Sequence, residues 1–192
     1  MKRRCRVAML VAGLLAISIL GAAQQEVPTM EDRLIVFTHQ VRMGLTLATV
    51  AALSPTLGDL RLHAQQLVNL LEGTKGRHFV QTAVALDLPL GLRSELSVMR
   101  DRLSQASQPG EARRLVLTAT ANVGAFLELA LSATLEGLEQ RRLDGASGAM
   151  LRAYAFLLAA YENPCGTTYV PALWAILRAF DLTERLQPST DG

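Results

Sequence analysis

The sequence predicts an all-α protein, a bundle of five or six helices around a long apolar central helix, preceded by an N-terminal signal peptide. Half of the 192 residues are hydrophobic but only 5% are aromatic, and the dominance of Ala and Leu favours helices. Apolar residues recur at helical spacing between Pro- and Gly-containing breaks. This length suits one domain with an ample core. The high apolar content excludes intrinsic disorder, and two cysteines exclude a disulfide framework.

Residues 1–23 have the three regions of a signal peptide. A basic start at residues 2–6 precedes an apolar run over 7–20, and Gly21-Ala22-Ala23 supplies small residues, with cleavage expected before Gln24. A helix spanning a membrane needs about 20 residues, more than this run offers; an uncleaved anchor is the alternative. We therefore expect an exported protein, periplasmic or extracellular, with a helical domain over 24–187 and a disordered tail over 188–192. Contact with a membrane is expected only through an uncleaved signal segment.

The apparent positive charge belongs to the signal segment. Four of the 19 basic residues lie within 1–23, so the mature chain carries 15 basic and 17 acidic residues, a net charge of −2. No other basic cluster is present. The chain is therefore not expected to bind nucleic acid.

The first helix is predicted over 30–53, with Thr29 and Asp32 placed as a capping box. It has one apolar face (Leu34, Phe37, Val41, Leu45, Ala48, Ala52) and a second on the opposite side (Val36, Met43, Leu47, Val50). Two apolar faces predict a helix sandwiched between others. Ser54 as N-cap and Pro55 at the first position are expected to start the second helix, which Gly73 ends.

Beyond Gly73, residues 73–77 are predicted as a loop, and 79–88 are ambiguous between strand and helix. A surface helix is expected over 92–107. The longest helix should run from Pro109-Gly110 to about Leu143. Between 115 and 135 its only charge is Glu128, which predicts a central buried helix, with a membrane span as the alternative. Asp144-Gly145 should form a turn before a helix over 146–162, and after a turn at 163–166 the last helix is expected over 168–187.

Three histidines are the candidates for holding haem or a metal ion: His39, His63 and His78. No H-x-x-x-H or H-E-x-x-H spacing places two ligands on one helix face. The absence of C-x-x-C-H excludes covalent haem attachment. No metal site is assigned and no cofactor is predicted; a haem- or metal-binding bundle is the alternative.

The sequence contains no motif that indicates catalysis. No G-x-S-x-G, P-loop or dinucleotide fingerprint occurs, so no catalytic residue is assigned. Cys165, the sole cysteine of the mature chain, lies in a Pro-Cys-Gly turn, where a structural role is expected. Glu128 is the first carboxylate that we would mutate in a search for a functional residue, because it is the only charged residue between 115 and 135.

The segment His63-Ala64-Gln65-Gln66-Leu67-Val68-Asn69-Leu70-Leu71-Glu72-Gly73, followed by Gly76, resembles one in uncharacterised exported bacterial helical proteins. There the pattern H-A-x-x-V-x-N-x-x-x-G leads into a loop rich in Asp and Gly. The resemblance implies export and a helical fold but no activity, and the loop here lacks that acidic character. On a helix His63 and Asn69 lie about 120° apart. We expect Asn69 to fix the following loop and His63 to pack against a neighbouring helix.

The leading hypothesis is an exported, non-catalytic helical domain that binds a protein partner or assembles with itself. The loop residues Asn69, Gly73 and Gly76 are the candidates for partner binding. A further alternative is an extracytoplasmic enzyme or small-molecule binder with a pocket between helices.

Overall fold

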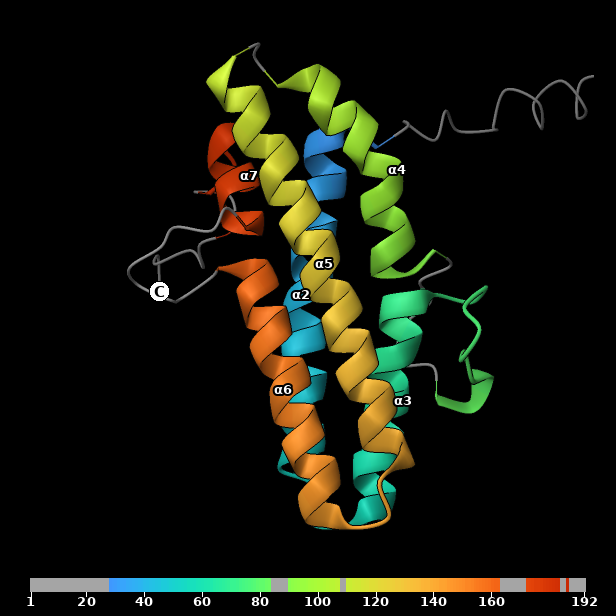
Figure 1. The fold of residues 1–192 in the computed structure, drawn as a ribbon. Helices are drawn as coiled ribbons and strands as arrows, with labels where there is room; N and C mark the ends of the chain where they lie inside the picture. Colours follow the sequence, from blue (N-terminus) through green and yellow to red (C-terminus); the bar gives the residue numbers. More distant parts are fainter. Residues whose placement is uncertain (1–27, 84–89, 108–109, 163–171, 184–185, 187–192) are drawn as a thin grey trace, which may run out of the picture.

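The computed structural model describes residues 28–83, 90–107, 110–162, 172–183 and 186. Within these ranges the chain forms an all-α bundle, as the sequence predicts (Figure 1). The elements are α2 (Met30–Ala52), α3 (Leu57–Glu72), the 3-10 turn η1 (Gln81–Ala83), α4 (Gly91–Ala106), α5 (Glu111–Glu139), α6 (Leu143–Tyr161) and α7 (Leu173–Ala179). The predicted signal peptide, the predicted turn at 163–166 with Cys165, and the predicted tail lie outside the described residues.

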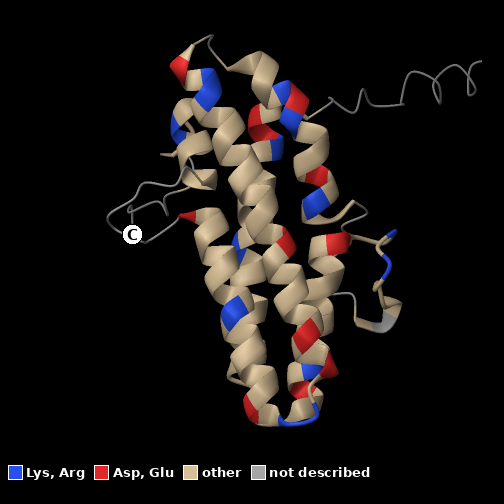
Figure 2. Cartoon of the chain, viewed as in Figure 1, with Lys and Arg blue, Asp and Glu red and all other residues tan. Residues whose placement is uncertain are grey.

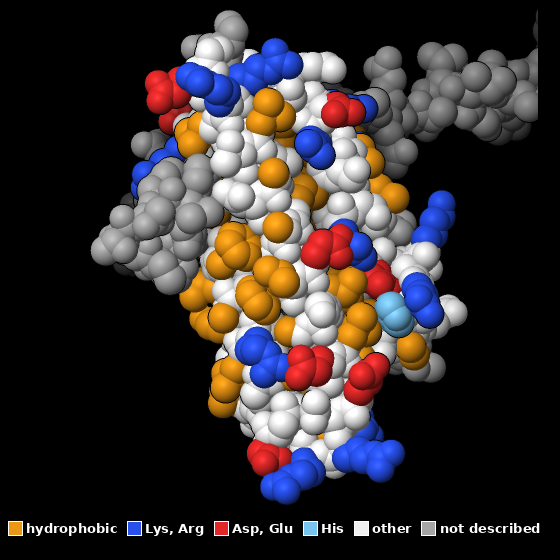
Figure 3. All heavy atoms as spheres, in the orientation of Figure 1, with side chains coloured by type: hydrophobic (Ala, Val, Ile, Leu, Met, Phe, Trp, Pro, Cys, Tyr) orange, Lys and Arg blue, Asp and Glu red, His pale blue; other side chains and the backbone are white. Residues whose placement is uncertain are grey.

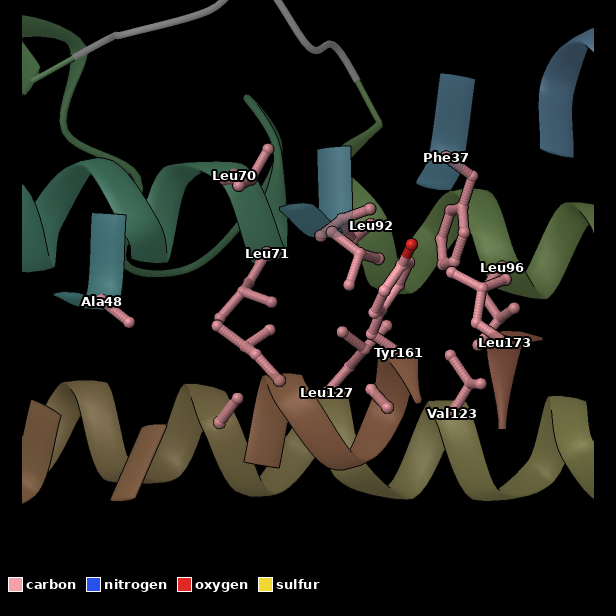
Figure 4. Packing of buried hydrophobic residues seen from close by; sticks show 14 of the residues in the cluster. Phe37, Ala48, Leu70, Leu71, Leu92, Leu96, Val123, Leu127, Tyr161 and Leu173 are labelled. Atoms are coloured by element: carbon pink, nitrogen blue, oxygen red, sulfur yellow. The ribbon is translucent and has the colours of Figure 1, made fainter. Parts of the chain in front are cut away.

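The longest helix, α5, organises the bundle. It contacts α3, α4, α6 and α7, while α2 packs against α3, α4 and α6. In Figure 1, α2, α3, α5 and α6 run side by side along one half of the molecule, and α4 and α7 complete the other half. Side chains from α2 to α7 meet in one core, where Phe37, Leu71, Leu92, Leu127 and Leu173 converge (Figure 4).

The predicted cap of α2 is confirmed, and that of α3 is wrong. Thr29 and Asp32 form the capping box of α2. At α3, however, the N-cap is Thr56, whose hydroxyl accepts a hydrogen bond from the backbone N–H of Asp59 at 3.1 Å. The Ser54 hydroxyl instead donates to the Val50 carbonyl at 2.8 Å. Ser54 therefore belongs to the end of α2, and Pro55 lies in the link before α3.

The prediction that α2 is sandwiched on two faces is also wrong. Val36 is 53% exposed and Val50 is 41% exposed, although Leu47 of the same predicted face is buried. The three neighbours of α2 cover one broad side of the helix. Met43, the remaining residue of that face, is half-buried against the core, so only the positions of Val36 and Val50 are open to solvent.

The central helix α5 is buried along one face rather than all round. Val116, Val123 and Leu127 are fully buried, while the opposite face is exposed and consists largely of small residues, such as Ala121 and Ala125. Figure 2 shows few charges along the middle of α5 and α6, and Figure 3 shows hydrophobic side chains gathered there. Ala suits either environment, which is why the sequence did not reveal the exposed face.

Two described helices, α2 and α5, are long and apolar enough to cross a membrane by length and composition. In each, 39% of the most apolar window is buried inside the protein. The larger part of each window is therefore not buried inside the protein.

The remaining boundaries need smaller corrections. Helix α4 follows its prediction and buries Leu92, Leu96, Met99 and Leu103 on one face. Helix α6 begins at Leu143, so Asp144 and Gly145 form its first turn rather than a preceding break. Helix α7 ends at Ala179, before the predicted end at Gln187. In the ambiguous segment 79–88, residues 79–83 are described, and η1 is the helical turn among them; 84–89 lie outside the described residues.

Candidate functional site

The most elaborate local structure in the described residues is the loop between α3 and η1. We call residues Gly73–Val80 the braced loop; in Figure 1 they stand out beside the bundle, near the junction of α3 and α4. The side chains that hold the loop come from the last turns of α3. Arg93, near the start of α4, adds further support, because it pairs both with Glu72 of α3 and with Glu128 of α5.

Asn69 anchors the far end of the braced loop. Its side chain is buried in the last turns of α3. The amide nitrogen donates to the Val80 carbonyl at 2.8 Å, and the amide oxygen accepts from the Val80 backbone N–H at 3.0 Å. Gln65 donates both to that oxygen at 3.2 Å and to the His78 carbonyl at 2.7 Å. These contacts are the loop-fixing role that the sequence predicts for Asn69.

Glu72 holds the middle of the loop. Its side chain is only 6% exposed; one carboxylate oxygen accepts from the His78 backbone N–H at 2.8 Å, and the other lies 3.0 Å from His78 Nδ1. Burial raises the pKa of Glu72, but the hydrogen bonds from His78 and the attraction to His78 and Arg93 outweigh it, so the pKa lies below its ordinary value.

Arg93 links this carboxylate to the central helix. Arg93 Nη1 lies 4.0 Å from Glu72 Oε1. Arg93 Nε donates a hydrogen bond to Glu128 Oε1 at 2.6 Å. The Glu128 side chain is 55% exposed, so this carboxylate is a surface ion-pair partner. On the predicted central buried helix, Glu128 thus lies on the exposed face.

Three glycines let the backbones come close enough to form the brace. Gly73 and Gly91 both have positive φ, and a Cβ built on either would lie 2.3–2.4 Å from backbone atoms of the other segment. A Cβ on Gly76 would lie 2.3 Å from Cβ of Glu72. Only glycine fits at these crossings without a shift of the main chain.

The outward side of the braced loop is basic and partly apolar. Thr74, Lys75 and Arg77 are exposed, and Val80 is 42% exposed. The ring of His78 and the carboxylate of Glu72 bind each other. The outward side of the loop therefore presents positive charge on a backbone that is held in place.

The three histidines have separate surroundings. His39 is exposed on α2. His63 Nδ1 lies 3.1 Å from the Gln66 side-chain oxygen, and His78 pairs with Glu72. Across the described part of the chain, no three His, Cys, Asp or Glu side chains gather in a way that could hold a metal ion. Within that part of the chain, neither His39 nor His63 belongs to such a group, and Cys165 lies outside the described residues.

Sequence reasoning found Asn69, Gly73 and Gly76 but missed Glu72, Arg93 and Gly91. The segment from His63 to Gly73 contains Glu72. The contact of Glu72 with His78, six residues further along the chain, depends on the path of the loop. Gly91 closes against Gly73 only after α3 and α4 are placed. No spacing pattern in the sequence predicts such a contact.

A search with protein-family models, curated proteins and solved structures found no match to this chain. The resemblance of the His63–Gly73 segment therefore stays an expectation from the sequence, and function must be argued from the braced loop itself.

Proposed function

We propose that the chain is an exported, non-catalytic helical module that binds a protein partner through the braced loop. One observation carries this proposal: the loop is fixed from inside by Asn69 and Glu72, yet its Lys75 and Arg77 side chains are exposed. Loops held by a rigid scaffold are common sites of binding.

The brace reduces the entropic cost of association. A flexible loop loses conformational entropy when it binds. A preorganised loop has already lost this entropy during folding, so its binding is less costly. Here the backbone of Val80 and His78 is held by side chains of α3. A plain surface turn needs neither a buried carboxylate nor three closely packed glycines.

A groove beside the loop extends the same surface. It lies between α4 and α5, encloses about 300 Å³ and shares Arg93 and Glu128 with the brace. Its lining includes Ala121 and Gly124, and Arg100 adds a further positive charge. Together with Lys75 and Arg77, this charge favours a partner that presents acidic residues.

Export rests on the pattern of residues 1–23, and absence of catalysis rests on the lack of a catalytic motif. An intact mass that begins at Gln24 supports export with cleavage. An intact Met1 would instead make the module a membrane-anchored one, with its partner sought at the membrane.

The partner is tested by the native mass of the complex after gentle purification from the host. We expect a second protein bound to the wild type and lost from Lys75→Glu/Arg77→Glu. The control Arg114→Glu/Arg141→Glu makes the same charge change at exposed sites away from the loop and should keep the partner.

Two outcomes would contradict the proposal. If the wild-type chain is purified without a bound protein, the proposal of a protein partner is wrong. If Lys75→Glu/Arg77→Glu keeps the partner, the interface does not lie on the braced loop. A mass of two copies, lost in the loop variant, would replace the acidic partner by a second copy of the chain.

A further inference from the structure

The groove between α4 and α5 is lined only by residues of these two helices, which lie side by side (Figure 1). It encloses about 300 Å³. The residues of its lining that matter below are Arg93, Leu96 and Arg100 of α4 and Ala121, Gly124 and Ala125 of α5. We call this surface the α4–α5 groove.

Small side chains leave the α5 side of the groove open to a close approach. Ala121 and Ala125 are exposed. Apart from the backbone of its own helix, a Cβ built on Gly124 would meet a single atom within 4 Å, Leu96 Cδ2 at 3.6 Å. Where the side chains at a contact are small, helix axes can approach to about 8 Å. A further helix therefore fits against this side of α5.

Arg100 is the uncompensated charge of the groove. Arg93 and Glu128 pair with each other, whereas no ion pair or hydrogen bond involves the exposed side chain of Arg100 among the described residues. The two arginines against one carboxylate give the lining a net charge of +1. Lys75 and Arg77 of the braced loop are also exposed, so the combined surface favours a negatively charged occupant.

The backbone around the groove favours a helix as that occupant. The lining residues belong to α4 and α5, whose backbone N–H and C=O groups are bonded within each helix. An extended segment would find no strand edge there to pair with, whereas a helix satisfies its own backbone groups. Arg93 and Arg100 lie seven residues apart, about 10 Å along α4, which matches two turns of a bound helix.

We propose that the α4–α5 groove binds an acidic amphipathic helix of the protein partner. A carboxylate of that helix binds Arg100, and its small side chains lie over Ala121, Gly124 and Ala125. The inference rests on the proposed function, because it assigns a second segment of the same partner. Arg102 is the matched control, since it is exposed on α4 but does not line the groove.

The probe for the test comes from the partner itself. A photoreactive side chain at Ala125 of the full-length chain is crosslinked in the host, and the attached partner peptide is sequenced by mass spectrometry and synthesised. We expect a peptide with net negative charge that becomes helical on binding, measured by NMR of the labelled peptide. A neutral or basic peptide, or one that stays extended when bound, would overturn the proposal.

Titration of this peptide against variants tests the pose. Arg100→Glu should weaken binding about tenfold or more because it places like charges together, whereas Arg102→Glu should change it by less than about threefold. Ala125→Leu fills the groove and should also weaken binding by about tenfold. Ala112→Leu, the same change at an exposed site of α5 away from the groove, should not. Equal effects within either pair would contradict the pose.

Two further outcomes separate this inference from the proposed function. If the partner remains sensitive to Lys75→Glu/Arg77→Glu but does not crosslink at Ala125, the groove is not part of the interface and only this inference is wrong. If the wild-type chain carries no bound protein at all, both are wrong.

Discussion

Asn69 shows how much a single side chain does at this site. Its two hydrogen bonds to Val80 and one from Gln65 tie α3 to the end of the braced loop. Asn69→Ala removes all three, so we expect a loss of about 1–2 kcal/mol in the free energy of unfolding. Chemical denaturation measures this, with Gln105→Ala at an exposed site of α4 as the control; equal losses in both would contradict the anchoring role.

Glu72 should make stability depend on acidic pH. Its pKa in the folded protein lies below the ordinary carboxyl value, so the unfolded chain binds the proton more readily. The contribution of Glu72 is therefore present above the unfolded pKa of about 4.3 and is lost as pH falls through the folded pKa.

Glu72→Gln tests this sign directly. The difference in unfolding free energy between wild type and variant should be largest near neutral pH and should shrink below about pH 4.3. Glu139→Gln makes the same substitution at an exposed position of α5 and is the control; it should change the free energy of unfolding by less than about 0.5 kcal/mol. A constant difference for Glu72→Gln between neutral and acidic pH would refute the claim.

At the scale of elements, the sequence predicted the helices well because their apolar spacing and caps are local. The capping box at Thr29 and the end of α3 at Gly73 both match. Errors arose where the deciding contact is not local. The exposed Ala face of α5 and the choice of Thr56 over Ser54 as N-cap depend on neighbouring helices and on competing hydrogen bonds.

The site was predictable only in part for the same reason. Asn69 and Gly73 stood in one short segment and could be assigned to a helix end and its loop. The ion pairs of Arg93 and the contact of Gly73 with Gly91 join segments about twenty residues or more apart, so only the packed fold shows them.

The crossing of α3 and α4 gives a graded test with glycine substitutions. Gly91→Ala meets both a positive φ and a backbone atom at 2.3 Å, and should cost about 2 kcal/mol or more. Gly110→Ala has positive φ but no close atom and should cost about 1 kcal/mol.

Gly148→Ala, inside α6 with no atom within 4 Å, is the matched control and should stabilise the protein by about 0.5–1 kcal/mol. Thermal or chemical unfolding of the three variants gives the order. If Gly91→Ala unfolds like Gly148→Ala, the two backbones do not meet as described.

At the scale of the whole molecule, the proposed function assigns stability and recognition to different parts of the chain. One core formed by six helices holds the bundle, while the braced loop and the adjoining groove lie on its surface. Because the proposed interface is basic and exposed, partner binding should weaken as salt rises from low to about 0.5 M, where screening is strong. Titration at several salt concentrations measures this; affinity that does not depend on salt would contradict an acidic partner.

The most direct test of the central claim is site-specific photo-crosslinking in the host cell. A photoreactive side chain at Arg77 should give a covalent adduct with one other protein. The same group at Leu151, which is 57% exposed on the apolar surface of α6, should not. An adduct at Arg77 that disappears when Asn69→Ala loosens the loop is the predicted result. An adduct confined to Leu151 would assign binding to the apolar face of the bundle and contradict the account.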